Sequence, residues 1–260
     1  MPSPTTYRMI SARFSPAVEL ARWLFGRYGI AVREEAHAPV LHRLAALAAG
    51  GGAELPVIVT PDGTVWDGAR QTLDGVDALS PVGRKLFGET SGERAANQAF
   101  LEEILAGLLT PVSRFVYAPL LPHKRALLAT VTHRAPAWER AVVSLCYPLW
   151  RILMVRRLGA TPQLLAEAPA KIEAALASVE AELARRGAPF LGGAEPNGLD
   201  IAFAALAGPL VFPRNYGARL PAVEDLPDAL RRFVISTRAR PAGDLVLRTY
   251  DAARFAKSSA

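Results

Sequence analysis

Residues 54–75, ELPVIVTPDGTVWDGARQTLDG, contain the most informative structural pattern of this chain. It begins with an apolar strand at residues 55–59, where Pro56 occupies a position that proline normally avoids in a sheet. The next four residues, TPDG, are predicted to form a turn, because the proline presets φ and the glycine permits a positive φ. Residues 64–66 return as a strand, and a helix is predicted over residues 69–79. The stretch therefore predicts a hairpin followed by a helix.

Upstream of this hairpin, strand and helix signals alternate. A strand is predicted over residues 6–12, and the pair Ser15-Pro16 opens a helix. Serine is a favoured N-cap, and the missing N–H of proline costs nothing in the first helical turn. A second strand at residues 31–35 and a second helix within residues 37–49 follow. The resulting order, β-α-β-α-β-β-α, predicts an α/β domain with a mixed four-stranded sheet.

The rest of the chain is predicted to be helix and loop. We expect an α/β domain at residues 1–80, a glycine- and proline-containing linker at 81–93, and an all-helical domain at 94–260. The strongest helical pattern covers residues 171–186. The apolar run at residues 141–155 is shorter than the ~20 residues of a membrane-spanning helix, and a proline and an arginine interrupt it. It is predicted to be a buried, bent helix.

Composition excludes several classes of protein. The chain has 260 residues, 51% hydrophobic and 21% charged, so wholesale disorder is excluded. Because the chain has a single cysteine, Cys146, it cannot form an internal disulfide, a dithiol redox centre or a cysteine-rich zinc site. Cys146 itself is predicted to be a small, buried hydrophobic residue. The net charge of +6 comes with no basic stripe interleaved with aromatics, so nucleic-acid binding is not expected. No secretory signal pattern is present, and we expect a cytoplasmic protein without stable membrane insertion.

Three segments, taken in this order, resemble the glutathione transferase family. FSPAVELARWLFGRYGI, residues 14–30, is similar to the family's first active-site loop and helix. Residues 54–75 are similar to its proline-strand, hairpin and third helix, and PFLGGAEPNGLDIAFAALAGPL, residues 189–210, to the start of a buried C-terminal helix. The resemblance covers nearly the whole chain. It implies an α/β thioredoxin-like N-terminal domain followed by an all-α C-terminal bundle.

The resemblance to the serine-type, bacterial-like members of this family implies an activity. Glutathione would be the co-substrate, without a metal, and its thiolate would attack a small hydrophobic electrophile in a detoxification reaction. Ser15 is the implied catalytic residue. A thiol with a pKa of ~8.5 is only about 3% ionised at pH 7, and a hydroxyl donor at a helix N-terminus favours the anion. The family resemblance also implies a homodimer.

Alternatives to this role of Ser15 remain open on the sequence. Ser15 can simply be the N-cap of its helix, and the two roles are compatible. Ser11, Arg13 and Tyr7 are the other candidates for the group that contacts the sulfur. Tyr7 is expected on the wrong side of the first strand for this role.

The remaining glutathione contacts implied by the resemblance are Phe14, the main chain of Leu55 before a cis Pro56, and the start of the third helix. There the family has an acidic residue followed by serine. Asp67 can be the acid, with Gly68 in place of the serine. In the alternative register Ala69 replaces the serine and the acid is lost. Either register removes a hydroxyl donor, which costs about 1–3 kcal/mol of binding if nothing compensates.

Other polar and aromatic residues have weaker functional interpretations. His37 and His42 are five apart, which is a poor spacing for one helical face, so we expect loop or surface histidines and no metal site. Asn197 and Asp200 are predicted to be a helix-capping pair. Five aromatic side chains are candidates for the lining of an acceptor pocket, with the hydrophobic core as the alternative location: Phe14, Trp66, Phe115, Tyr117 and Trp150.

Two other functions compete with the enzyme. The missing serine after Asp67 favours a non-catalytic binding or scaffold protein on the same fold. The apolar run at residues 141–155, together with the basic net charge, suggests reversible association with a membrane surface.

Overall fold

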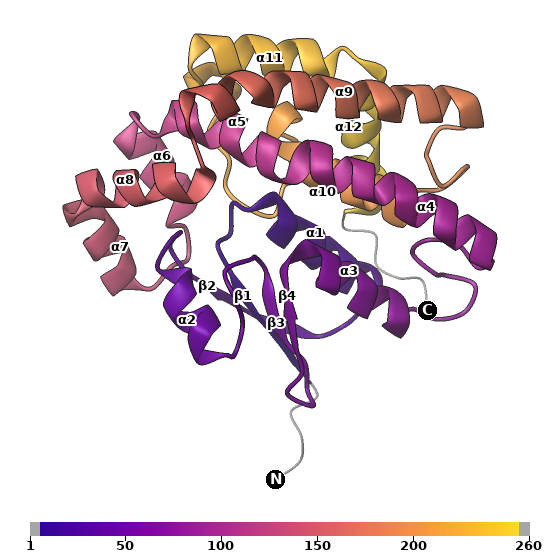
Figure 1. Cartoon of the computed structure of the whole chain (residues 1–260), viewed down its shortest axis with the longest axis horizontal. Coiled ribbons are helices and arrows are strands. Elements are labelled where there is room, and N and C mark those ends of the chain that lie inside the picture. Colours follow the sequence, from indigo (N-terminus) through magenta and orange to yellow (C-terminus); the bar gives the residue numbers. More distant parts are fainter. Residues whose placement is uncertain (1–5, 255–260) are drawn as a thin grey trace.

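The computed structural model describes residues 6–254, which form an α/β unit followed by a helical remainder (Figure 1). The α/β unit has the predicted order β-α-β-α-β-β-α, so that prediction is confirmed. Predicted and observed ends of these elements differ by one or two residues. The elements are β1 (Tyr7–Ser11), α1 (Pro16–Arg27), β2 (Val32–Ala36), α2 (His42–Ala48), β3 (Val57–Val59), β4 (Val65–Asp67) and α3 (Gly68–Leu79).

The four strands form the predicted mixed sheet, in the order β2-β1-β3-β4. Strand β1 runs parallel to β2 and antiparallel to β3, and β3 and β4 form the predicted hairpin. Successive side chains of a strand point to opposite faces of the sheet. Met9 therefore lies in the large core with α1 and α3, whereas Ile10 packs with Val57 and with Ala46 of α2. The sheet therefore lies between α2 on one face and α1 and α3 on the other.

The remainder after α3 is helical, as predicted, and its core is continuous with that of the α/β unit. Helix α4, the π-helical turn η1 and α5 follow one another without a break. The elements are α4 (Ser91–Ile104), η1 (Leu105–Leu109), α5 (Thr110–Leu120), α6 (Lys124–Val131), α7 (Ala137–Leu145), α8 (Tyr147–Leu158), α9 (Pro162–Arg186), α10 (Gly198–Val211), η2 (Val223–Asp225), α11 (Asp228–Arg238) and α12 (Pro241–Ala253).

Helix α10 is buried along its whole length and contacts both α1 and α12. The predicted capping pair begins it. Oδ1 of Asn197 accepts a hydrogen bond from the backbone N–H of Leu199 at 2.8 Å, and Asp200 accepts one from the N–H of Asn197 at 2.9 Å. The Asp200 carboxylate also accepts from the N–H groups of Leu191 and Gly192. These bonds satisfy donors that would otherwise be buried without partners.

The run at residues 141–155 is not the buried helix that its apolar composition predicts. It is divided between α7 and α8, which meet at Cys146. Much of its apolar surface faces outward: the Leu145 side chain is 82% exposed. Cys146 is exposed as well, so the prediction of a buried cysteine is wrong. An apolar run shows that a segment has apolar faces, but not that neighbouring elements cover all of them.

None of the helices within residues 6–254 is both long and apolar enough to cross a membrane.

Candidate functional site

A cavity of about 170 Å³ lies between the α/β unit and the helices that follow it. Its walls come from both parts of the chain. From the α/β unit it is lined by Ala12, Phe14, Ser15, Ala17, Pro39, Val40, His42, Glu54 and Leu55. From the helices it is lined by Leu109, Thr110, Ser113, Tyr117, Leu121, Leu127, Val131, Met154, Arg157 and Leu158.

Ser15 lies at this cavity as the N-cap residue of α1. Its backbone is extended, and its carbonyl accepts the first hydrogen bonds of the helix, from the N–H groups of Val18 and Glu19 at 3.0 Å each. Its side chain makes no capping hydrogen bond. The hydroxyl is therefore not committed to the helix that it precedes. The partial positive charge of the helix N-terminus favours an anion at this position.

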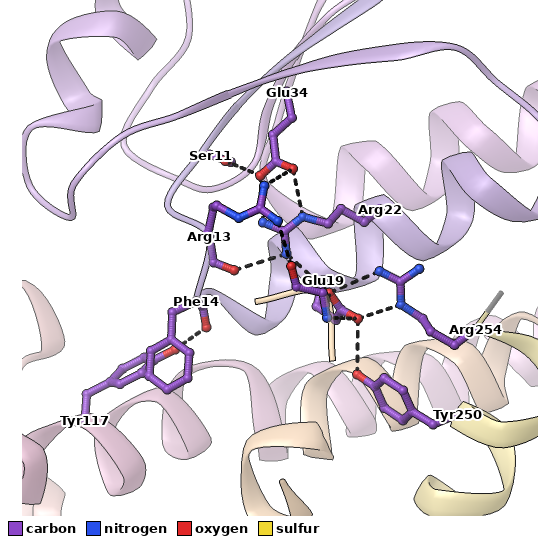
Figure 2. Close-up of polar contacts among 10 residues, drawn as sticks. Ser11, Arg13, Phe14, Glu19, Arg22, Glu34, Tyr117, Tyr250 and Arg254 are labelled. Atoms are coloured by element: carbon purple, nitrogen blue, oxygen red, sulfur yellow. Dashed lines mark hydrogen bonds and ion pairs between the residues drawn. The ribbon is translucent and has the colours of Figure 1, made fainter. Parts of the chain in front are cut away.

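The loop that carries Ser15 is held in place by Tyr117 of α5. The Tyr117 hydroxyl donates a hydrogen bond to the carbonyl of Phe14, and the two ring centroids are 4.4 Å apart (Figure 2). Burial raises the pKa of Tyr117 well above its ordinary value. Tyr117 therefore positions the loop as a neutral donor and does not have its hydroxyl proton available for a sulfur.

Ser11 and Arg13, two alternatives to Ser15, are bound to Glu34 of β2 (Figure 2). The Ser11 hydroxyl donates to Glu34 at 2.6 Å and the Arg13 guanidinium at 2.9 Å, and Arg22 of α1 donates at 2.6 Å. Burial opposes ionisation of Glu34, but the hydrogen bond and charge of Arg22 hold its pKa below the usual value. Neither Ser11 nor Arg13 lines the cavity.

The third alternative, Tyr7, lies in β1 and does not line the cavity. Its ring packs edge-on against Phe25, with centroids 5.4 Å apart, and against Trp66, with centroids 5.7 Å apart. Of the four candidate donors in this region, the geometry brings Ser15 to the cavity.

A second buried carboxylate, Glu19, anchors α1 to the end of the chain (Figure 2). It is fully buried and pairs with Arg22 at 3.2 Å and with Arg254 at 2.7 Å. It also accepts a hydrogen bond from the N–H of Gly217 at 3.0 Å and one from the hydroxyl of Tyr250 at 3.4 Å. Glu19 thus fixes α1, and the serine at its start, against α12 and the loop before η2.

Leu55 lines the cavity beside Ser15, and the Leu55-Pro56 peptide bond is cis. No backbone–backbone hydrogen bond of Leu55 is present within residues 6–254. An extended peptide can bind such a segment through main-chain hydrogen bonds, as an added strand does. The structure therefore leaves the Leu55 main chain available at the position where the resemblance implies a contact with glutathione.

The start of α3 does not line the cavity, unlike Ser15 and Leu55. Asp67 is the N-cap residue of α3 and Gly68 is its first residue, but neither they nor Ala69 lines the cavity. The Asp67 carboxylate accepts a hydrogen bond from the N–H of Gly52 at 3.0 Å. Burial raises the pKa of Asp67, and the negative charge of Glu54 raises it further, against the effect of the Gly52 hydrogen bond.

Gly68 has a backbone conformation that favours glycine. Its φ is +81°, in a region that residues with a Cβ rarely adopt. A Cβ at this position would also lie 3.0 Å from Cβ of Glu54. A serine at this position would therefore be strained.

His42 lines the cavity and does not lie where its sequence predicts. It was expected in a loop or at the surface, but its side chain is only 3% exposed, and both ring nitrogens are buried without a hydrogen-bond partner within residues 6–254. Burial, with the nearby positive charge of Arg157, lowers its pKa to about 4. His42 therefore presents a neutral imidazole to the cavity. His37 does not line the cavity, and its Nδ1 bonds to the carboxylate of Glu139 of α7 at 2.6 Å.

The buried imidazole predicts a pH dependence of stability. His42 has an ordinary pKa of 6.5 and a folded-state pKa of about 4. Between these values the unfolded state binds more protons, so the free energy of unfolding should fall by roughly 3 kcal/mol as the pH drops from 6.5 to 4. Urea unfolding at a series of pH values measures this slope.

The His42→Gln variant should lose that part of the slope, because glutamine does not titrate. The matched control is His123→Gln, since His123 is an exposed histidine next to α6. Equal slopes in the wild type and in His42→Gln would contradict the prediction.

The five aromatic candidates for an acceptor pocket divide into two groups. Phe14 and Tyr117 line the cavity. Trp66 packs against Tyr7, Phe115 against Phe233 with centroids 4.6 Å apart, and Trp150 donates a hydrogen bond to the carbonyl of Pro39 at 2.8 Å. Periodicity alone does not distinguish these cases, because it does not show which distant segment an aromatic side chain contacts.

In the part of the chain that the structure describes, no three His, Cys, Asp or Glu side chains are grouped so that they could hold a metal ion.

Neither the protein-family models nor the curated proteins include a match to this chain. Solved structures do match. A glutathione transferase from Phanerochaete chrysosporium has a TM-score of 0.62 and 17% identity, covering 96% of this chain and 97% of that one. A glutathione S-transferase from Sinorhizobium meliloti has a TM-score of 0.55 and 16% identity, covering 98% of both chains. One from Methylobacillus flagellatus, solved with glutathione bound, has a TM-score of 0.50 and 15% identity, covering 92% of this chain and 98% of that one. At these identities the likeness shows a common fold.

Proposed function

We propose that this protein, which has the fold of the glutathione transferases, binds glutathione in its interdomain cavity and transfers the glutathionyl group to a small hydrophobic electrophile. One observation carries the proposal: the Ser15 hydroxyl stands at the N-terminus of α1, makes no capping bond and lines the cavity together with Leu55. The glutathione bound in a solved structure of the same fold supports the choice of co-substrate.

In the proposed complex each group of the chain has a separate task. The hydroxyl of Ser15 donates a hydrogen bond to the cysteinyl sulfur, and the N-terminus of α1 stabilises its negative charge. The main chain of Leu55 binds the peptide part of glutathione. Phe14 and Tyr117 hold the loop in place. We expect a homodimer, as the family resemblance implies.

The reaction is a nucleophilic substitution or addition at carbon. The thiol first releases its proton to solvent. The thiolate then supplies the electron pair for a new S–C bond, and the leaving group departs with the bonding pair, or an addition product takes up a proton. No oxidant or reductant is needed.

The helical wall of the cavity indicates what kind of electrophile fits. It is mostly apolar: η1 contributes Leu109, α6 contributes Leu127 and Val131, and α8 contributes Met154. Burial of apolar surface at such a wall favours a hydrophobic acceptor at about 25 cal/mol per Å². The polar groups of this wall are few, so we propose that they orient the acceptor and do not determine its class.

Titration of the protein with glutathione tests the proposal directly. Ultraviolet difference absorbance at varied pH reports the thiolate, and we expect the bound thiol to ionise with a pKa about 2 units below its free value. Turnover of an activated aromatic halide should accompany it. No binding at millimolar glutathione, or binding as the neutral thiol, would contradict the proposal.

The start of α3 favours a second candidate function, a binding or scaffold protein without catalysis. Gly68 lacks a hydroxyl, and the Asp67 carboxylate is bound to Gly52 and lies near Glu54. Both features weaken recognition of a negatively charged group at this helix. Calorimetry separates the two candidates: binding of glutathione without a change in its thiol pKa, and without turnover, would favour the scaffold.

A further inference from the structure

Helices α7 and α8 present an outward apolar face. On α7 it consists of Trp138, Val142 and Leu145, which recur at the spacing of one helical side. On α8 it consists of Leu149 and Ile152. All five side chains are exposed, Leu145 by 82% and Trp138 by 55%. We call these five residues the α7–α8 face.

This face is additional to the surface by which the two helices pack on the protein. The inward side of α8 contains Tyr147, Trp150 and Met154, all buried. On α7, Glu139 is buried and accepts hydrogen bonds from His37 and from the N–H of Ala38. Helix α8 is therefore apolar on two sides, and the outer side has no partner within residues 6–254. In Figure 1, α6, α7 and α8 lie together at the left edge of the molecule.

The segment that contains this face is strongly basic, and Arg140, Arg151 and Arg156 lie on the same two helices as the face. Residues 124–158 contain seven lysines and arginines and a single acid, so this segment has a formal charge of +6, as large as that of the whole chain. The acid is the buried Glu139, whereas all seven cations are exposed. The seven are Lys124, Arg125, Arg134, Arg140, Arg151, Arg156 and Arg157.

We propose that the α7–α8 face binds reversibly to the surface of an anionic lipid bilayer, independently of the proposed function. Exposed apolar side chains bordered by cations are the composition of helices that lie in the membrane interface. Trp138 is the kind of residue that prefers the headgroup level, and each cation near the surface adds attraction to anionic lipid. Because no helix within residues 6–254 can cross the bilayer, the contact is peripheral.

Charge also argues against the other occupant, a second copy of this chain. A symmetric contact through the α7–α8 face would bring its cations against those of the partner. No exposed acid within residues 124–158 compensates them. Like charges across an interface disfavour association.

Co-sedimentation with two kinds of vesicle tests the proposal. The wild type should bind vesicles that contain phosphatidylglycerol at physiological salt and should bind pure phosphatidylcholine vesicles at least tenfold more weakly. Binding should also shift the fluorescence of Trp138 to the blue, and Trp138→Phe should lose most of the shift. Equal binding to both vesicles, or no binding to either, would overturn the proposal.

Two pairs of surface substitutions then locate the contact. Arg151→Gln with Arg156→Gln, and Leu145→Ser with Ile152→Ser, should each weaken vesicle binding by roughly tenfold or more. The control is Ile235→Ser, which changes an exposed apolar residue on α11. Unchanged binding in both double variants, or a concentration-dependent dimer that only Leu145→Ser with Ile152→Ser abolishes, would contradict the assignment. All these positions are exposed, so folding should be preserved, and circular dichroism checks it.

Discussion

Replacing Ser15 by alanine is expected to lower kcat/KM for the electrophile, at saturating glutathione and neutral pH, roughly 25-fold, with little change in the free energy of unfolding. A pKa about 2 units lower raises the thiolate fraction at pH 7 from about 3% to about three quarters. The hydroxyl of Ser15 makes no capping bond, so its removal should not weaken α1. The inflection in the pH profile of kcat/KM should move up by about 2 units in Ser15→Ala, which a purely structural residue would not cause.

Ser113 provides a matched control for this experiment. It also lines the cavity, but its hydroxyl donates to the carbonyl of Leu109 at 2.9 Å. Ser113→Ala should therefore leave the pH profile of the thiol unchanged. A Ser15→Ala variant with the wild-type profile and full activity would exclude Ser15 as the group that stabilises the thiolate.

Replacing Glu19 by glutamine should have the largest effect on stability, a loss of about 3–5 kcal/mol in the free energy of unfolding. The side chain is fully buried, and its negative charge faces the guanidinium groups of Arg22 and Arg254. Glutamine keeps the size of the side chain but removes this charge, so two buried or nearly buried cations lose a counter-ion. Urea-induced unfolding followed by circular dichroism measures the loss.

Asp244→Asn is the control for charge removal as such. Asp244 pairs with Arg248 at 2.8 Å on the exposed side of α12, where an ion pair contributes about 0–1 kcal/mol. A loss in Glu19→Gln no larger than in this control would show that the buried cluster does not hold α1 against α12. Glutathione binding by Glu19→Gln, measured below its unfolding transition, shows whether the position of Ser15 depends on the same cluster.

Local sequence signals were sufficient where neighbours along the chain supply the physical cause. The TPDG turn needs only a proline and a glycine at the right places to predict the β3–β4 hairpin. The pair Asn197 and Asp200 needs only its spacing of three to cap α10, and Ser15 is an N-cap because a helix with Pro16 follows it. Such interactions span a few residues, so the sequence contains nearly all the information about them.

The site was less predictable, because the competing partners come from distant segments. Ser11 and Ser15 have the same functional group. The Ser11 hydroxyl donates a hydrogen bond to Glu34 on the neighbouring strand, whereas the Ser15 hydroxyl makes no hydrogen bond to the helix that it caps. His42 is unremarkable in sequence, and it is buried only because α2 lies against a cavity formed in part by α8. No signal in the sequence near either residue indicates these neighbours.

Local patterns along the chain were enough to predict the order of strands and helices, the hairpin, the caps and the position of the serine before α1. Each of these depends on turn geometry or on hydrogen bonds between near neighbours. Long-range packing, in contrast, selects which donors face the cavity, buries His42 and leaves several apolar side chains of residues 141–155 exposed. Burial depends on what packs against a side chain, and that partner is set by chain segments far away in the sequence.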